Sequence, residues 1–302
     1  MTPGKTYISA DTTVTLDMVA REAGVSASTV SRILNGTARV REAKTLAVQA
    51  AIEKGLMRDG YSGLFVSGHW RENDERRCID HLLSRRVEGI ILVTSCLPDT
   101  ELVRLSRRVP LLLTGRHVQS ERIFCLDYDN TQGARLATDY LIAQGHRRIA
   151  FIAGPADRAD ALQRLNGYKA ALASRKIAFQ SRLVVAGDYY DAAGYQAMTR
   201  LLQSGIEFTA VFAANDQSAY GAMLALHRHG RVVPRDVSVV GFDDLPQSGY
   251  TIPPLTSVHR SIDAIGHAAA EAIIDLIEGR RPVVTAPAAT LAIRESTLPL
   301  HP

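Results

Sequence analysis

The pattern of apolar and polar positions changes near residue 55. Before this point, apolar residues recur at helical spacing, as in Leu16, Val19, Ala20 and Ala23, which occupy one helical face. After it, short apolar runs alternate with helical patterns, which is typical of parallel sheets with crossover helices. The sequence therefore predicts an α-helical N-terminal segment followed by a larger α/β region.

The N-terminal pattern predicts two short helices joined by a tight turn within residues 14–36. Gly24 can take a positive φ at the turn, and Ser26 is a suitable N-cap for the second helix. Val30, Ile33 and Leu34 of that helix face inward, so small or polar residues remain outside near its start. The major groove of DNA admits such a helix-turn-helix, and a generic helical hairpin is the alternative.

The alternation of strands and helices in the larger region predicts two doubly wound subdomains. We expect a ligand to bind between them, at the carboxyl ends of the strands. Candidate strands are 62–67, 89–94, 110–114, 123–127, 148–153, 183–186, 210–213 and 237–241. Candidate helices are 131–144, Asp191 to 202, Asn215 to Gly230 and Ser261 to Gly279.

Composition narrows the class of protein. The 302 residues, 46% hydrophobic, suffice for two cores and a small added module, while a net charge of +4 favours nucleic acid only weakly. Cys78, Cys96 and Cys125 are widely separated and lie in or next to apolar runs, which predicts reduced thiols in the core rather than a metal site. There is no N-terminal apolar signal segment and no run near the ~18 residues of a membrane span. We therefore expect a soluble cytoplasmic protein.

Longer stretches resemble one known family. The run VTLxxVAxxAGVSxxTVSRxLNG at 14–36 resembles the headpiece of the LacI/GalR family of bacterial repressors. Further blocks, at 129–155, 164–168, 210–226, 233–244 and 253–258, resemble the regulatory domain of that family. Residues 1–13 are polar and have no periodicity, which predicts a disordered lead. The resemblance implies a headpiece at 14–54 and a periplasmic-binding-protein-like domain at 55–302. Within that domain, it implies subdomains at about 55–147 and 148–302.

The resemblance implies a DNA-binding transcriptional repressor that acts as a homodimer on operator DNA and responds to a small hydroxyl-rich effector, such as a sugar. A cytosolic sugar-binding protein with a vestigial headpiece is the alternative. The sequence contains no P-loop, no nucleophile elbow and no dinucleotide-binding glycine motif after a strand. We therefore expect no enzyme activity, cofactor or metal.

In the headpiece, the family's base-reading positions fall on Ala27, Ser28 and Arg32. Arg32 is suited to a bidentate guanine contact worth about 1–3 kcal/mol of discrimination, and a phosphate contact is the alternative. Four further polar residues are expected to contact phosphates or cap helices: Thr15, Thr29, Ser31 and Asn35.

In the regulatory domain, Arg164, Asn215 and Asp243 fall at positions that hydrogen-bond the effector in the family. A carboxylate accepts from hydroxyls, a guanidinium donates, and an amide does both. Tyr189 matches a position that stacks on a sugar, and Asp129 and Asn130 add polar groups. The alternatives are a helix cap for Asn215, a turn role for Asp243 and a surface position for Tyr189. His146 is expected to be structural.

One departure from the family pattern is large. Ala43, Leu46, Ala47 and Ala50 predict a third helix, which in the family completes the headpiece. After this helix, the family continues with a hinge helix and the first strand of the regulatory domain, and neither has a counterpart here. About 50–60 residues are absent on the family pattern. We expect the third headpiece helix to fuse with the next one into a rod from Arg41 to Asp59, with Gly55 as a weak point. Either strand 62–67 pairs beside 89–94, or the first subdomain is poorly stable. Without the hinge helix, the minor-groove contacts of the family are lost.

Overall fold

The computed structural model describes residues 37–68, 71–93 and 95–300. Close contacts divide the chain into two compact units, Met1–Leu46 and Ala47–Pro302. The predicted lead and helix-turn-helix lie outside the described residues. Most of the expected rod forms one helix, because α3 (Thr37–Met57) is unbroken over 21 residues, beginning before Arg41 and ending before Asp59.

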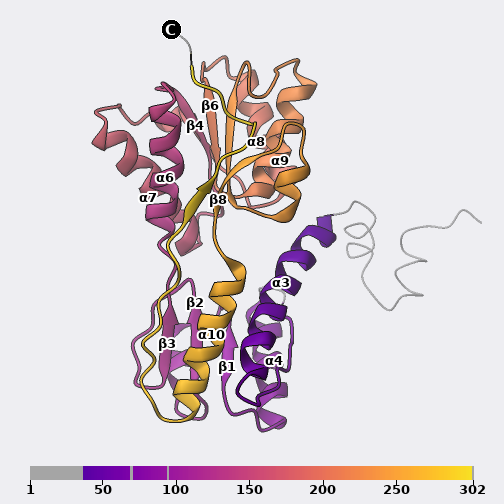
Figure 1. Ribbon diagram of the computed structural model, residues 1–302, viewed down its shortest axis with the longest axis vertical. Coiled ribbons are helices and arrows are strands. Elements are labelled where there is room, and N and C mark those ends of the chain that lie inside the picture. The colour runs from indigo at the N-terminus through magenta and orange to yellow at the C-terminus, as the bar shows by residue number, and fades with distance from the viewer. Residues whose placement is uncertain (1–36, 69–70, 94, 301–302) are drawn as a thin grey trace, which may run out of the picture. The chain divides into compact units, whose positions relative to one another are not determined.

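The described residues of the second unit form two sheets, and we call each sheet with its helices a lobe. The first lobe has a parallel sheet of order β1-β2-β3. Its apolar residues form one core with α4 and α5 and another with α3 and α10, so helices cover both faces (Figure 1). Its elements are β1 (Ile90–Leu92), β2 (Leu111–Thr114), β3 (Ile123–Leu126), α3, α4 (Glu72–Ser84), α5 (Asp99–Ser106) and α10 (Ile262–Ile277).

The strand predicted at 62–67 is absent, so this prediction is wrong. Residues 61–68 have no regular structure, and the Leu64, Phe65 and Val66 side chains are 58%, 41% and 40% exposed. A strand is stable only when a neighbouring strand takes up its backbone hydrogen bonds, and within the described residues β1 pairs with β2 alone. An apolar run without such a partner does not form a strand.

Helix α3 packs closely on α10 through small residues. A Cβ atom on Gly266 would lie 2.3 Å from the Cβ of Ala51, and one on Gly55 would lie 2.6 Å from the Cβ of Ala270. The two backbones therefore approach with no large side chain between them. Ile52 of α3 is buried beside this crossing. Gly55, expected to weaken the rod, is instead one of its packing points.

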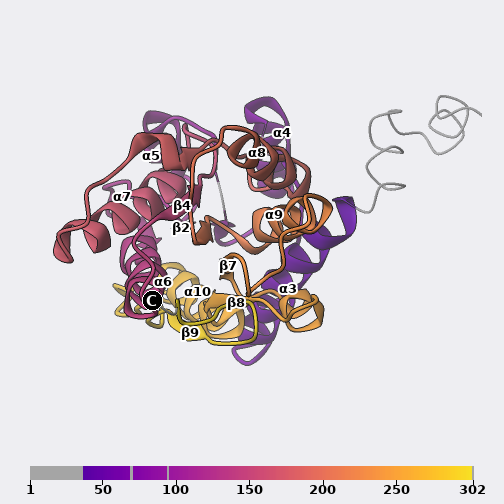
Figure 2. The same ribbon diagram turned by 90° about the horizontal axis from the view of Figure 1, so that it is seen from above.

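The second lobe has a sheet of order β5-β4-β6-β7-β8-β9, parallel except for the β8–β9 pair. Helices α6 and α7 cover one face, and α8 and α9 cover the other (Figures 1 and 2). Its strands are β4 (Ile149–Ile152), β5 (Val184–Val185), β6 (Ala210–Ala213), β7 (Ser238–Asp243), β8 (Thr256–His259) and β9 (Thr290–Ala292). Its helices are α6 (Asn130–Ala143), α7 (Ala159–Ser174), α8 (Asp191–Gln203) and α9 (Asp216–Arg228), with short turns at Ser181–Leu183 and Pro246–Tyr250.

Within the described residues, the chain passes between the lobes three times. Helix α6 contributes to the core of the second lobe, whereas α10 packs on the sheet of the first, so crossings follow β3, β8 and α10. Three crossings replace the single boundary that the sequence predicted between residues 147 and 148.

Local signals account for several of these elements. Asn215 caps α9 by accepting from the Ser218 amide at 3.0 Å, and Ser261 caps α10 by accepting from the Ala264 amide at 3.2 Å. His146 is buried and hydrogen-bonds the Thr209 hydroxyl at 2.9 Å, which confirms its structural role. No helix in the described part of the chain is long and apolar enough to cross a membrane.

The three thiols are free, as expected for widely separated cysteines. Each is half-buried, so none is a full core residue. Within the described residues, no group of His, Cys, Asp and Glu side chains is arranged to hold a metal ion.

Candidate effector site

Predicted effector residues meet at one edge of the second sheet. Asp243 is the last residue of β7, and Asn215 comes two residues after β6, next to β7 in the sheet. The carboxyl ends of parallel strands lie at the same edge, and α7 brings Arg164 to it. We call Asn130, Arg164, Tyr189, Asn215 and Asp243 the effector cluster.

Arg164 is the centre of this cluster and is only 3% exposed. Its Nε donates to Asn130 Oδ1 at 3.2 Å, and its Nη1 donates to the Ala214 carbonyl. The guanidinium carbon lies 3.9 Å from the ring centroid of Phe242, a stacked cation–π contact. Burial opposes the charge, but the nearby Tyr189 phenol and carboxylates outweigh it, so the pKa of Arg164 is raised. The guanidinium is thus fixed and charged.

Asp243 faces two guanidinium groups. Its Oδ1 accepts a hydrogen bond from Arg260 Nη2 at 2.7 Å and lies 3.9 Å from Arg164 Nη2. Its φ is +111°, and that of Asp244 is +54°, both in the region that favours glycine. Such backbone strain costs about 1–3 kcal/mol per residue and persists only when surrounding contacts hold it.

Asp216 supplies those contacts. It is fully buried in the first turn of α9, and it accepts from the Leu245 amide at 2.7 Å and the Ser248 hydroxyl at 2.6 Å. Ser257 donates to the other oxygen of the same carboxylate and accepts from the Asp244 amide. A Cβ on Gly241 would lie 2.2 Å from Asp216, so only glycine fits there. Asp216 therefore ties the turn after Asp243 to the sheet.

The pH dependence of stability is expected to report on Asp216. Burial raises its pKa from 3.8 to about 7, although hydrogen bonds from Ser248 and Ser257 oppose the shift. The folded state therefore holds the proton more tightly than the unfolded state. The stabilisation is complete below the unfolded pKa and is lost as pH rises through about 7.

We expect Asp216→Asn to remove this dependence. Urea denaturation of both proteins between about pH 4 and pH 8 should show that the stability of the natural protein relative to the variant falls as pH rises. Asp157→Asn, at an exposed carboxylate, serves as the control. Parallel profiles for the natural protein and Asp216→Asn would contradict the assignment.

Asn215 and Tyr189 are held together. Besides capping α9, Asn215 donates from Nδ2 to the Tyr189 carbonyl at 2.8 Å. The Tyr189 hydroxyl donates to Asp160 at 3.0 Å, and its ring lies where a Cβ on Gly154 would be, 2.4 Å from a ring carbon. The helix-cap alternative is thus correct for Asn215, which also belongs to the cluster. Tyr189 is half-buried rather than a surface residue.

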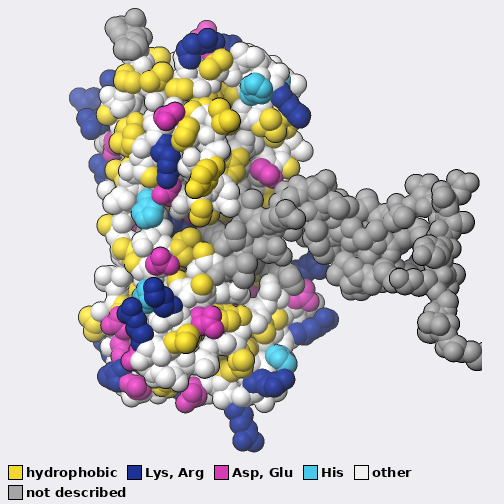
Figure 3. Space-filling view, turned by 45° about the vertical axis from the view of Figure 1, so that its right-hand side comes forward, with side chains coloured by type: hydrophobic (Ala, Val, Ile, Leu, Met, Phe, Trp, Pro, Cys, Tyr) yellow, Lys and Arg dark blue, Asp and Glu magenta, His cyan; other side chains and the backbone are white. Residues whose placement is uncertain are grey.

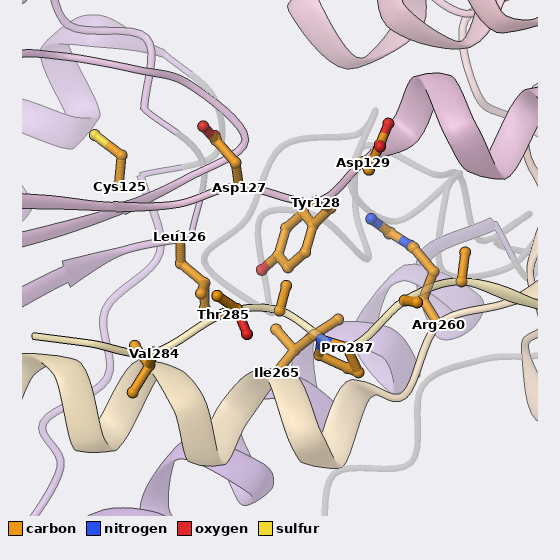
Figure 4. A pocket seen from close by; sticks show the side chains of 13 residues that line it. Cys125, Leu126, Asp127, Tyr128, Asp129, Arg260, Ile265, Val284, Thr285 and Pro287 are labelled. Atoms are coloured by element: carbon orange, nitrogen blue, oxygen red, sulfur yellow. The ribbon is translucent and has the colours of Figure 1, made fainter.

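Asp129 directly precedes Asn130 of the effector cluster. It is exposed, caps α6 by accepting from the Gln132 amide at 2.7 Å, and lines a cavity of about 280 Å³. Figure 4 shows Asp129 and Arg260 toward one end of this cavity, with Val284 and Thr285 farther along it. All three crossings between the lobes contribute to the lining, and Arg260 reaches from there to Asp243.

Three residues near the effector cluster were not predicted as site residues from the sequence. Asp216 and Asp160 lie in first turns of helices, where a carboxylate is ordinarily explained by the helix dipole. Arg260 lies between β8 and the cap of α10, and no local pattern marks it. Their roles depend on which strands are neighbours, which only the tertiary structure reveals.

Both the N-terminal part and the α/β part of the chain match known protein families. Residues 15–55 match the family model described as bacterial regulatory proteins, lacI family, and residues 138–297 match that of a periplasmic binding protein-like domain. The HTH-type transcriptional regulator GalR of Escherichia coli strain K12 is 34% identical, covering 88% of this chain and 90% of GalR. The chain belongs to the lacI family.

Solved structures of this family share the fold. The transcriptional regulator CelR in complex with cellobiose superimposes with a TM-score of 0.76 at 31% identity, covering 94% of this chain and all of that one. The lac repressor dimer bound to operator gives a TM-score of 0.71 at 29% identity, covering 84% and 90%. The predicted fold class, a helix-turn-helix module with a periplasmic-binding-protein-like α/β domain, is confirmed.

The GalR alignment also measures a length difference. It spans 308 positions, whereas 88% of the 302 residues here is about 266, so about 42 positions of the alignment have no residue of this chain.

The predicted DNA-contacting residues of this lacI-family chain lie outside the described residues: Thr15, Ala27, Ser28, Thr29, Ser31, Arg32 and Asn35. On the face in Figure 3, Lys and Arg side chains of the described part are scattered among acidic and apolar ones. The candidate DNA-contacting residues are therefore known only from the sequence of residues 14–36.

Proposed function

We propose that this protein is a sequence-specific DNA-binding transcriptional regulator whose operator affinity is controlled by a small hydroxyl-rich effector. The observation that carries the effector part is the cluster around Arg164, where buried and ordered donors and acceptors meet at the carboxyl ends of neighbouring strands. The lacI-family match over 15–55 supports the DNA-binding part. The protein acts in the cytoplasm as a homodimer, the form in which the lac repressor was solved on its operator.

Effector control follows from the chain path. The three crossings between the lobes line one cavity. A ligand that binds one arrangement of the lobes more tightly than another increases the population of molecules in that arrangement. The residues that match the lacI-family model, 15–55, run into α3, whose Ile52 and Leu56 belong to the same apolar core as α10.

About 42 positions of the GalR alignment have no residue in this chain, and this difference favours a second candidate function. We propose that the absent segment includes the hinge helix of the family. A protein without it loses the minor-groove part of operator recognition. The second candidate is therefore a sugar-binding protein in which the headpiece binds DNA without sequence preference.

A binding experiment separates the two candidates. Duplexes are enriched from a random library with the purified full chain, and affinities for the enriched and a scrambled duplex are compared across salt concentrations. A regulator prefers the enriched duplex at physiological salt, and Arg32→Ala lowers that preference by about 10- to 100-fold. Lys5→Ala, in the polar lead, is the control. Equal and steeply salt-dependent affinities for both duplexes would establish the second candidate.

A further inference from the structure

Six exposed arginines lie in the turns at one end of the first lobe. Two of them follow α4, two follow α5, one directly precedes β3 and one follows α10. We call these residues the arginine face: Arg85, Arg86, Arg107, Arg108, Arg122 and Arg281.

The first sheet brings these turns together at the amino ends of its strands. Strands β1, β2 and β3 are parallel neighbours, so the turns that precede them lie at one edge, about 5 Å from one to the next. Arg122 Nη1 also donates to the Arg107 carbonyl at 3.3 Å. A Cβ atom on Gly89 would lie 3.1 Å from Ile277, the last residue of α10, so this helix ends at the same edge. Figure 1 shows the edge at the lower end of the first lobe, away from the second lobe.

The charges of the arginine face are not neutralised within the described residues. None of the six guanidinium groups lies within ion-pair distance of a described carboxylate, whereas the neighbouring Arg280 is paired with Asp275 and Glu278. The same turns contain two exposed glutamates, Glu88 and Glu121. Six arginines against two glutamates leave a surplus of positive charge at this edge.

The helix dipole accounts for only part of this arrangement. Arg85 and Arg107 are the C-caps of α4 and α5, where a positive charge is favoured. Arg86 follows the cap at a φ of +57°, a left-handed conformation that glycine adopts without strain and arginine does not. Arg122 adjoins no helix end. Several of these arginines therefore have no role in stabilising a helix.

The arrangement fits a chain of anions better than a single anion. Guanidinium groups that converge on one point would hold a free phosphate, whereas these arginines come from four separate segments along a sheet edge. A nucleic acid presents its phosphates in a row, and arginine binds phosphate through paired charge-assisted hydrogen bonds. Residues 15–55 match the lacI family, so DNA is the polyanion that the proposed function brings to this protein.

We propose that the arginine face is a second DNA-binding surface, which contacts backbone phosphates of duplex DNA and reads no bases. It differs from the predicted headpiece surface in its residues and in its lack of sequence preference. The inference goes beyond the proposed function, because that function assigns DNA recognition to residues 14–36 alone.

Arg86 offers a variant that separates binding from folding. Arg86→Gly removes a positive charge and also suits the left-handed backbone, so it should keep or raise the melting temperature while it weakens DNA binding. Lys176→Gly is the matched control, because Lys176 is an exposed cation at a φ of +56° after α7 in the second lobe. It should affect the melting temperature in the same direction and leave DNA binding unchanged.

Triple variants enlarge the effect at constant net charge. The test variant combines Arg86→Gly, Arg108→Gln and Arg122→Gln. The control variant combines substitutions of three exposed cations of the second lobe: Lys176→Gly, Arg182→Gln and Arg231→Gln. Affinities of the full chains for the enriched and the scrambled duplex are measured between about 50 and 200 mM salt.

We expect the test variant to bind both duplexes about 10- to 100-fold more weakly than the natural protein, as for the loss of three exposed ion pairs. The slope of log affinity against log salt should become shallower by about 0.9 for each phosphate contact that is lost. The preference for the enriched duplex should not change, since the arginine face reads no bases. The control variant should bind like the natural protein.

The outcomes distinguish this inference from the proposed function. Equal slopes and affinities in the test and control variants would overturn the arginine face, and a retained preference for the enriched duplex would leave the regulator standing. A shallower slope in the test variant, with no preference in the natural protein, would support the arginine face and refute the regulator. Arginine-dependent binding to phosphatidylserine vesicles but not to DNA would assign the face to a membrane surface and overturn the proposal.

Discussion

Replacing Arg164 with alanine is expected to abolish effector binding and to lower the free energy of unfolding by about 3–5 kcal/mol, as for a buried charge pair that loses one partner. The variant leaves Asn130 Oδ1 and the Ala214 carbonyl without their donor, and it opens a void over the Phe242 ring. Urea denaturation and sugar-dependent melting measure the two effects.

Two further variants make this expectation specific. Arg164→Lys keeps the charge but lacks the planar fork, so it should recover part of the stability and little of the affinity. Arg175→Ala removes an exposed arginine from the C-terminal end of the same helix and should change stability by less than about 0.5 kcal/mol. An Arg164→Ala protein as stable as Arg175→Ala would refute the central role of this guanidinium.

The second large effect is expected at the crossing of α3 and α10. In Gly266→Leu the new Cβ would lie 2.3 Å from the Ala51 Cβ and 2.8 Å from the Ala51 carbonyl carbon, so the helices must separate. Separation exposes Ile52 and Leu56, each worth about 1.5–3 kcal/mol when buried. We expect a loss of about 3 kcal/mol or more in urea denaturation, with faster amide exchange in residues 47–57.

Gly249→Leu is the matched control, because a Cβ there meets no atom within 4 Å and φ is not positive. Ala51→Gly combined with Gly266→Ala should recover part of the stability lost in Gly266→Ala alone, since it removes the 2.3 Å contact between the two Cβ atoms and leaves the contacts with the α3 backbone at 2.8 and 2.9 Å. Equal losses in Gly266→Leu and Gly249→Leu would show that the close crossing contributes nothing.

The elements predicted well are those whose signals are local. Strand β6 has the predicted bounds, 210–213, because four apolar residues are fully buried in the middle of a sheet. Helices α9 and α10 begin after Asn215 and Ser261, whose side chains bond the first-turn amides. Apolar continuity and caps act over a few residues, so the sequence reveals them directly.

The elements predicted poorly depend on distant partners. Strand β8 was not predicted, because Thr256 and Ser257 are polar. Both are fully buried, since the Thr256 hydroxyl accepts from the Arg294 amide and the Ser257 hydroxyl donates to Asp216. The strand at 62–67 was predicted but has no partner. In the site, the family resemblance placed Arg164, Asn215 and Asp243, and the structure brings them together. Asp160 and Arg260 join them only through tertiary contacts.

The three crossings between the lobes determine how this protein can be divided by recombination. A gene fragment that ends at residue 147 encodes α6 without the sheet on which it packs, and it omits α10, which covers the first sheet. Neither lobe is therefore encoded by one continuous segment of the gene. A functional chimera with another family member must exchange at least two separate segments for either lobe, so effector specificity in such a protein is expected to change by point substitution rather than by exchange of a single block.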